Sequence, residues 1–241
     1  MQYVDFHTHI LPHMDDGSKD LEMSSAMLEM LREEDVCVVF ATPHYYCYRE
    51  SEEAFLARRE ESVRKLCDSL YGSDVILSSP EIRLGAEIRL IKDMPELLEI
   101  EQLILEGTNM ALFELPYDEY HVWMGENIHN ISIKYHLRPI IAHVERYVDL
   151  FRENEYEELL SIPNAIYQIS VSFMNAKKTA EFTAGLIRKG YPVLFGSDCH
   201  NITTRPPVMK TSFQHLKKFC IKYKIPERKI HDLFEYQRSF V

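Results

Sequence analysis

The sequence contains little glycine and no long apolar run. Only 8 glycines occur among 241 residues, so the chain has few flexible joints. No apolar segment approaches the roughly 20 residues that a membrane-spanning helix needs. Internal repeats, low-complexity tracts and Gly/Ser linkers are also lacking. These absences predict one domain over residues 1–241 that is not embedded in a membrane.

The cysteines do not form a recognisable disulfide framework. The chain has 5 of them, an odd number, and none stands in a C-x-x-C pair. Met1 leads directly into a strand-like segment, with neither the basic nor the apolar region of a secretory signal. We therefore expect reduced thiols and a cytoplasmic protein.

Positive charge is in deficit. The chain has 27 Lys and Arg against 38 Asp and Glu, a formal net charge of -11. Nucleic-acid binding depends on Lys and Arg that neutralise phosphates, so nucleic acid is not an expected partner. Carboxylates that bind metal ions also count as negative, although the ions make the site itself positive. The acidity therefore does not exclude a phosphorylated substrate.

Short apolar, β-branched runs alternate with longer amphipathic ones. The predicted strands are Tyr3–Phe6, Val36–Thr42, Ile82–Ile88, Met110–Leu115, Pro139–His143, Ala165–Ser170 and Val193–Gly196. The predicted helices cover residues 20–34, 51–71, 95–106, 121–136, 147–161, 176–189, 208–222 and 226–236. Such alternation predicts parallel strands with right-handed crossovers. Seven units favour an α/β fold of the distorted parallel (β/α)7 barrel type over a short open sheet.

The pair His7-x-His9 lies at the end of the first predicted strand. Side chains two residues apart in a strand point the same way, so both imidazoles face one point. Neutral imidazole is a common ligand of transition metals. An isolated H-x-H is a weak indicator of a metal site.

Other strands carry similar groups. Six of the seven predicted strands have His, Asp or Glu at their C-terminal ends, and in a β/α barrel these ends meet at one face. Each residue alone has an ordinary explanation, such as a capping group or a solvated carboxylate. Together they predict a metal cluster. The residues are His7, His9, His44, Glu87, Glu114, His143, Asp198 and His200.

A family resemblance rests on these motifs in combination. They are H-x-H, Asp15-Asp16-Gly17, Thr42-Pro43-His44, G-x-E ending at Glu87, a later Glu, His143-Val144-Glu145-Arg146-Tyr147, and Ser197-Asp198-Cys199-His200-Asn201 followed by Arg205-Pro206-Pro207. The set resembles the PHP (polymerase and histidinol phosphatase) superfamily, from His7 to about Pro207. The closer resemblance is to its bacterial manganese-dependent protein-tyrosine phosphatases, which act with tyrosine kinases in capsular and exopolysaccharide synthesis. Val144 departs from the Pro or Ile of many relatives.

The resemblance implies three divalent ions, Mn²⁺ in the first place, with Fe or Zn as alternatives. It assigns His7, His9, Glu87 and Asp198 to one ion. Glu87 would bridge to a second ion bound by Glu114 and His143, and Asp16, His44 and His200 would hold the third. Many superfamily members have His where this chain has Asp16 and Glu114, whereas the phosphatase branch has carboxylates. Asp16 is preferred to Asp15 for its place beside Gly17, and contacts of Asp15 or His13 with the site stay open.

The implied activity is that of a phosphoric monoester hydrolase, in which metal-activated hydroxide attacks phosphotyrosine. Arg146 and Arg205 would bind the phosphate oxygens, or else serve as a helix anchor and a loop ion-pair partner. The expected substrate is a phosphotyrosine protein, with a bacterial tyrosine autokinase as the candidate. Tyr45, Tyr46 and Tyr48 either form an aromatic rim for the substrate or pack in the ordinary way. The sequence leaves an oligomer open.

Three alternatives remain at this stage. The same metal site could act on a small phosphomonoester such as histidinol phosphate, or on a nucleotide phosphodiester, which the acidic charge disfavours. A PHP domain without catalysis could serve as a scaffold, although no expected ligand position is empty. Finally, Cys199 and Arg205 have the C-x5-R spacing of cysteine-dependent phosphatases. That segment contains no glycine and is followed by Pro206-Pro207, which we interpret as a chance match.

Overall fold

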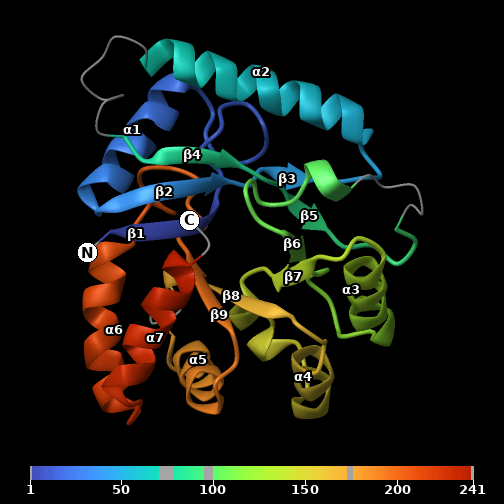
Figure 1. Cartoon of the computed structure of the whole chain (residues 1–241), viewed down its shortest axis with the longest axis vertical. Coiled ribbons are helices and arrows are strands. Elements are labelled where there is room, and N and C mark those ends of the chain that lie inside the picture. Colours follow the sequence, from blue (N-terminus) through green and yellow to red (C-terminus); the bar gives the residue numbers. More distant parts are fainter. Residues whose placement is uncertain (1, 71–78, 95–99, 173–175, 240–241) are drawn as a thin grey trace.

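Parallel strands surrounded by helices form the fold (Figure 1). The computed structural model describes residues 2–70, 79–94, 100–172 and 176–239. One sheet has the order β1 (Tyr3–Thr8), β2 (Val36–Ala41), β4 (Glu81–Leu84). The other has the order β3 (His44–Tyr45), β5 (Glu87–Arg89), β6 (Met110–Glu114), β7 (Arg138–Ile141), β8 (Ile166–Ser170), β9 (Val193–Gly196). All pairings between these strands are parallel, as the alternation predicted.

The predicted strand Ile82–Ile88 is wrong as a single element, because the chain changes sheets within it. Gly85 N–H donates to Ala41 O at 3.0 Å, and Glu87 N–H donates to Pro43 O at 3.0 Å. The segment that pairs with it, from β2 to β3, also changes sheets, and it does so at Pro43, which has no N–H to donate to a strand ladder. Each of the two segments therefore contributes one strand to each sheet. Glu87 begins β5 instead of ending a strand.

Contacts beyond the ladders connect the two sheets on their other side. Thr8 forms an isolated parallel bridge with Cys199. Asp198 N–H donates to His7 O at 2.8 Å, and His9 N–H donates to Cys199 O at 3.0 Å. The end of β1 is thus joined to the chain that follows β9. The α/β fold with parallel sheets is confirmed, whereas a closed seven-unit barrel stays a prediction.

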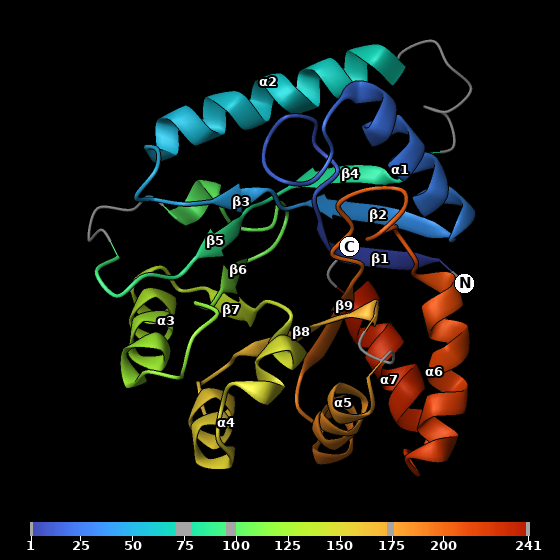
Figure 2. The same cartoon turned by 180° about the vertical axis from the view of Figure 1, so that it is seen from behind.

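The helices lie around the outside of the strands, as both views show (Figure 2). None of the described helices combines the length and the apolar composition needed to cross a bilayer. These helices are α1 (Leu21–Glu33), α2 (Glu52–Leu70), α3 (Val122–Lys134), α4 (Glu153–Leu160), α5 (Lys177–Lys189), α6 (Lys210–Lys222) and α7 (Glu227–Arg238). Six of the seven follow their predicted ranges closely, and the remaining one, α4, covers only part of its predicted range.

Two helix predictions differ from the structure. Of the range 95–106, residues 95–99 lie outside the described residues, and the rest holds only the 3-10 turn η1 (Ile100–Gln102). The chain there turns at Gly107, with φ +77, and pairs with β6 through Leu105. The range 147–161 contains the end of the 3-10 helix η2 (Val144–Asp149) and then α4. Buried rings, Tyr147 on Phe151 with centroids 5.1 Å apart, hold the bend between them.

An apolar interior is enclosed by strands of both sheets. Alternate residues of a strand face the same side, and Val4, Phe6 in β1 and Phe40 in β2 belong to the same cluster as Leu112 in β6. The full interior cluster is Val4, Phe6, Val38, Phe40, Leu105, Met110, Leu112, Ile140, Ala142, Ile166 and Leu194. A second set of apolar residues fills the space between the strands and the helices.

The same interior positions become polar towards the C-terminal ends of the strands. Glu114 stands two residues after Leu112, and Gln168 two residues after Ile166. Both therefore project on the interior side of their strands. The apolar cluster forms the floor of whatever these polar groups bind.

Removal of a ring from this floor should destabilise the fold. Phe40 is fully buried and stacks on Phe6 with ring centroids 5.2 Å apart. We expect Phe40→Ala to lower the free energy of unfolding by about 3–5 kcal/mol, measured by urea denaturation. The control is Ile221→Ala on α6, where the side chain is 80% exposed and the change should stay within about 0.5 kcal/mol. Equal losses in both variants would contradict the assignment of the interior.

Candidate metal centre

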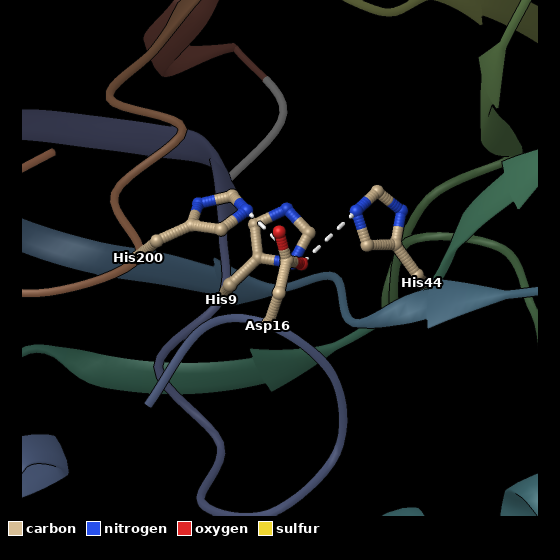
Figure 3. Close-up of side chains that lie close together, drawn as sticks. All are labelled: His9, Asp16, His44 and His200. Atoms are coloured by element: carbon tan, nitrogen blue, oxygen red, sulfur yellow. Dashed lines mark ion pairs between the residues drawn. The ribbon is translucent and has the colours of Figure 1, made fainter. Parts of the chain in front are cut away.

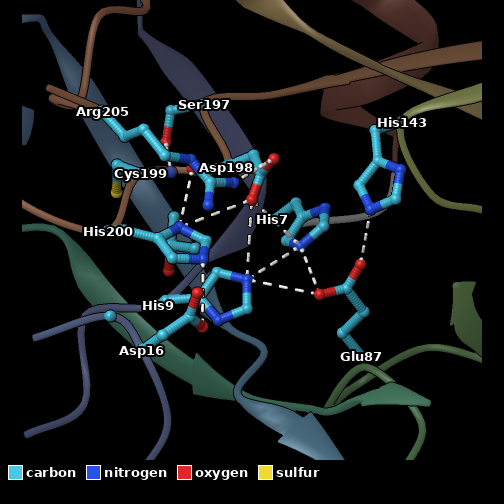
Figure 4. A network of polar contacts seen from close by, with 12 residues as sticks. His7, His9, Asp16, Glu87, His143, Ser197, Asp198, Cys199, His200 and Arg205 are labelled. Carbon is cyan, nitrogen blue, oxygen red and sulfur yellow. Dashed lines mark hydrogen bonds and ion pairs between the residues drawn. The ribbon is translucent and has the colours of Figure 1, made fainter. Parts of the chain in front are cut away.

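The structure brings the nine candidate ligands together, and Figure 4 labels seven of them, all except His44 and Glu114. They come from the end of β1, the loop after it, the starts of β3 and β5, the end of β6, and the segments that follow β7 and β9. The nine residues are His7, His9, Asp16, His44, Glu87, Glu114, His143, Asp198 and His200. Their proximity is an observation, and their role as ligands stays a prediction.

The first group consists of His7, His9, Glu87 and Asp198. The Nε2 atoms of His7 and His9 lie 3.1 Å apart. Glu87 Oε2 is 3.1 Å from the first and 3.3 Å from the second, and Asp198 Oδ1 is 3.6 Å from both. All four side chains are almost completely buried.

These spacings match those of a metal site. In a tetrahedral site with metal–ligand distances of about 2.1 Å, neighbouring ligand atoms lie about 3.4 Å apart. Two imidazole nitrogens that face each other can share at most one proton, and two carboxylates face the same point. A divalent cation would satisfy all four groups, so the residues present fit a metal ion.

Glu87 connects this group to a second one. Its other oxygen, Oε1, lies 2.9 Å from His143 Nε2, which is 3.6 Å from Glu114 Oε1. His44 Nδ1 lies 3.0 Å from Glu87 Oε2, and His44, Glu87 and Glu114 form a second possible metal group. The carboxylate of Glu87 thus has imidazoles around both oxygens.

The third group, drawn in Figure 3, consists of His9, Asp16, His44 and His200. Asp16 Oδ1 lies 3.5 Å from Nε2 of both His44 and His200. The Asp16 side chain is 70% exposed, whereas the others are mostly buried. The set predicted from the sequence for the third ion did not include His9. In the structure, His9 belongs to both the first and the third group.

Three ring nitrogens in these groups are short of partners. His44 Nδ1, His143 Nδ1 and His200 Nε2 are buried and make no hydrogen bond to any described residue. Glu87 Oε2 lies 3.0 Å from His44 Nδ1, which is within hydrogen-bonding distance, but the two groups are not aligned for a hydrogen bond. A buried polar atom without a partner is unfavourable. Coordination of a metal ion by the free lone pair would remove this cost.

Asp15 lies behind the cluster and orients two of its members. Its Oδ2 accepts a hydrogen bond from His9 Nδ1 at 2.7 Å and another from His44 N–H at 2.9 Å. The first contact turns His9 Nε2 towards Glu87. A histidine that binds metal commonly donates its other ring N–H to a carboxylate in this way. The open question about Asp15 is thus answered by a contact with His9, and Asp16 faces the cavity.

Gln168 is a functional candidate that sequence reasoning missed. Its Oε1 accepts hydrogen bonds from His7 Nδ1 at 3.1 Å and from His143 N–H at 2.6 Å. The side chain is fully buried in β8. The available signal was a lone amide among the apolar residues of a predicted core strand, where a buried polar group needs partners.

The backbone is specialised where it presents the ligands. His143 and Asp198 have φ values of 31 and 52, in the left-handed region that few non-glycine residues adopt. A Cβ atom on Gly196 would lie 2.7 Å from His7 Cβ, so only glycine allows β9 to approach β1 this closely. This backbone geometry directs the side chains of His143 and Asp198 into the cluster, whereas a regular continuation of β7 and β9 would direct them elsewhere.

Electrostatics keep the carboxylates anionic. Burial by itself would raise the pKa of Glu87, but His7 and His44 hold it well below its usual range. The imidazole of His200, 3.5 Å from the Asp16 carboxylate, lowers the pKa of Asp16 to about 2. Burial lowers the pKa of His143 to about 4, so its imidazole is neutral at pH 7. Metal binding requires anionic carboxylates and neutral imidazoles. Burial by itself would lower the pKa of His44, but Glu87 raises it to about 9, so this imidazole would have to release a proton when it binds a metal ion.

Three arginines surround the cluster. Arg205 Nη2 lies 2.6 Å from Asp198 Oδ2, and Arg146 contacts the same oxygen. Both guanidinium groups are partly exposed. Arg89, which the sequence analysis did not single out, pairs with Glu114 at 2.8 Å. The proposed phosphate-binding role of Arg146 and Arg205 stays a prediction.

The tyrosines after β3 divide into two kinds. Tyr45 is buried and packs on Phe55 with centroids 5.0 Å apart, which is ordinary core packing. Tyr46 stacks near His44, with centroids 5.3 Å apart, and Tyr48 is exposed. A cavity of about 460 Å³ lies beside them and is lined by Met14, Asp15, Asp16, His44, Tyr46, Arg49, Glu50 and Arg58. A second cavity, of about 410 Å³, lies between α5 and α7 and contains none of the nine residues.

The C-x5-R segment does not form a phosphate-binding loop. Cys199 is fully buried, and burial raises the pKa of its thiol. The N–H groups of residues 203, 204 and 205 all donate to Asn201 Oδ1, so they do not point at a common anion site. The same loop is closed by His200 N–H, which donates to Arg205 O at 3.0 Å. The loop serves to hold His200 and Arg205.

Fold and site together define a class of protein, in which parallel strands end at a shared cluster of imidazoles and carboxylates suited to divalent metal ions. The particular family follows from the sequence as a whole. A family model for capsular polysaccharide synthesis proteins, CpsB/CapC, matches residues 3–233, and the chain belongs to this family. The resemblance drawn from the motifs is thereby confirmed.

Individual relatives agree with this placement. The tyrosine-protein phosphatase YwqE of Bacillus subtilis (strain 168) is 28% identical over 206 residues, 84% of this chain and 79% of YwqE. The tyrosine-protein phosphatase CpsB of Streptococcus pneumoniae is 27% identical over 229 residues, 89% of this chain and 90% of CpsB. A solved structure from work on these two metal-dependent tyrosine phosphatases superposes with a TM-score of 0.78 at 25% identity, covering 99% of this chain and 94% of that one.

Replacement of the buried thiol provides a direct test of the rejected cysteine mechanism. We expect Cys199→Ser to keep most of the phosphatase activity on phosphotyrosine, because the thiol is buried away from the cavity. The measurement is kcat/KM beside the metal content of each purified protein. Complete loss of turnover with metal content unchanged would reinstate a thiolate nucleophile.

Proposed function

We propose that the protein is a metal-dependent protein-tyrosine phosphatase that hydrolyses phosphotyrosine with three divalent ions, Mn²⁺ foremost. The observation that carries this proposal is the cluster in which Glu87 joins two groups of buried imidazoles and carboxylates. Membership in the CpsB/CapC family and relatives named tyrosine-protein phosphatases support the same activity.

The ligands proposed are the nine residues described above, divided into the three groups with Glu87 between the first and the second. Mixed imidazole and carboxylate ligands suit Mn, Fe and Zn, and metal supply contributes to the choice. When bound, the ions activate water for in-line attack on phosphorus.

Arg146 and Arg205 would place the phosphate. Both now contact Asp198 Oδ2 from the open side of the cluster. A guanidinium group binds phosphate oxygens through two parallel hydrogen bonds, and its charge offsets the charge that accumulates in the transition state. The leaving phenolate has a pKa of about 10 and departs more readily than an alkoxide. The chain therefore needs no strong general acid, and we assign none.

The face around the cluster favours a protein substrate. Tyr48, Tyr117 and Ile202 are exposed apolar residues, and they stand in the loops after β3, β6 and β9. These loops lie at the same end of the strands as the cluster. We propose that the three residues contact a protein substrate together, as exposed apolar residues do where they gather into one patch. A small phosphomonoester such as histidinol phosphate, the second candidate, would leave this rim unused.

Two broader statements belong to the same proposal. We propose that the phosphotyrosine protein is a bacterial tyrosine kinase of polysaccharide synthesis and that hydrolysis takes place in the cytoplasm, since the family is one of capsular polysaccharide synthesis. We also propose that the two sheets act as one distorted β/α barrel, which the shared interior cluster and the bridge between Thr8 and Cys199 support.

Metal removal should abolish the reaction. EDTA treatment is expected to eliminate phosphotyrosine hydrolysis, and Mn²⁺ should restore it at least as well as Mg²⁺ because imidazole ligands favour transition metals. Asp198→Ala and His143→Ala should each lose metal and lower kcat on the order of 10³-fold, since a bound metal contributes several kcal/mol to transition-state stabilisation. Elemental analysis accompanies the assay. Restoration by Mg²⁺ alone would contradict the proposed use of the histidines.

Truncation of the rim should separate protein substrates from small ones. We expect the double variant Tyr48→Ser with Tyr117→Ser to lower kcat/KM for a phosphotyrosine protein by about tenfold, with kcat/KM for p-nitrophenyl phosphate unchanged. Ile133→Ser, an equally exposed apolar position near the C-terminal end of α3, is the control. Faster hydrolysis of histidinol phosphate than of any phosphotyrosine substrate would favour the second candidate.

A further inference from the structure

Arg89 lies opposite Glu114 in the ladder between β5 and β6. Its Nη1 donates to Glu114 Oε2 at 2.8 Å. The guanidinium group is 25% exposed and the carboxylate 14%. Because the two residues are register partners on rigid strands, this ion pair is fixed by the fold and not by a chance meeting of two long surface side chains.

The two oxygens of Glu114 have different tasks. While Oε2 is held by Arg89, Oε1 faces His143 Nε2 at 3.6 Å, and Glu114 forms a possible metal group with His44 and Glu87. The ion pair therefore leaves one carboxylate oxygen directed into the cluster. Glu114 is also the most exposed member of the second group, so its side chain has the greatest freedom to turn towards solvent.

We propose that Arg89 is a positioning residue that fixes the carboxylate of Glu114 for metal binding. The inference rests on the proposed function, because it takes Glu114 as a ligand. A partner that orients a ligating carboxylate commonly contributes 10- to 100-fold to metal affinity. Arg89 also places a positive charge directly beside the carboxylate of Glu114.

A neighbouring ion pair provides a matched control. Arg83 on β4 pairs with Glu81 at 2.7 Å, and the Arg83 side chain is 21% exposed, close to the value for Arg89. Neither member of that pair belongs to a possible metal group among the described residues. Arg89→Met and Arg83→Met thus remove the same charge and the same type of contact, in one case beside the cluster and in the other case away from it.

The experiment is a titration of the metal-free full chain with Mn²⁺ alone, followed by calorimetry, with phosphotyrosine hydrolysis as the second readout. We expect Arg89→Met to weaken one Mn²⁺ binding step by about 10- to 100-fold and to lower kcat at limiting Mn²⁺. Excess Mn²⁺ should restore kcat, with KM for phosphotyrosine unchanged. Arg89→Lys keeps the charge but loses the planar fork, and we expect an intermediate affinity. Arg83→Met should match the wild type in every measurement.

Three results would overturn the inference. One is unchanged Mn²⁺ affinity in Arg89→Met. Another is a raised KM that excess Mn²⁺ does not correct, which would indicate direct contact with the phosphate. The third is an equal loss of Mn²⁺ affinity in both Met variants. If the wild type binds Mn²⁺ but hydrolyses no phosphotyrosine, the proposed function fails, and the Mn²⁺ titration still decides the role of Arg89.

Discussion

The structure depends on the burial of one carboxylate among imidazoles. Glu87 is 1% exposed, and rings of His7, His9, His44 and His143 lie within 3.3 Å of its oxygens. A buried anion is costly unless opposite charge or hydrogen-bond donors surround it. The chain satisfies this constraint by bringing β1, β3 and the segment after β7 to the start of β5. The change of sheets at residues 42–43 and 85–86 places His44 and Glu87 as register partners.

The interior of the molecule is divided along the strands. Apolar residues occupy its lower half, and polar groups at the same strand positions occupy its upper half. A floor of this kind excludes water below the cluster and strengthens every electrostatic interaction above it, because the effective dielectric constant falls. On the side away from the floor, Asp16, Arg146 and Arg205 are partly exposed.

The sequence predicted the elements and motifs better than the contacts between them. Apolar periodicity located nearly every strand, and the motifs identified the residues that converge, because parallel strands deliver their C-terminal ends to one face. Periodicity could not predict the break at Gly85, because the residues on both sides of it have the pattern of a strand. The break arises only because β4 pairs with β2 and β5 pairs with β3. Gln168 and Arg89 were missed for a related reason. Their roles depend on which residue lies across the ladder, and spacing along one strand carries no such information.

The hydrogen bonds that join the end of β1 to the chain after β9 span most of the polypeptide. During synthesis, His7 and His9 leave the ribosome long before Asp198 and His200 exist, so the groups that contain those late residues can form only after most of the polypeptide has been made. A nascent chain therefore offers only fragments of a site, with correspondingly weak affinity for metal ions. On the proposed function, complete loading would follow folding, and ions that bind the folded form alone would stabilise it by mass action. Cellular metal supply would in this way govern the lifetime of the folded protein as well as its activity.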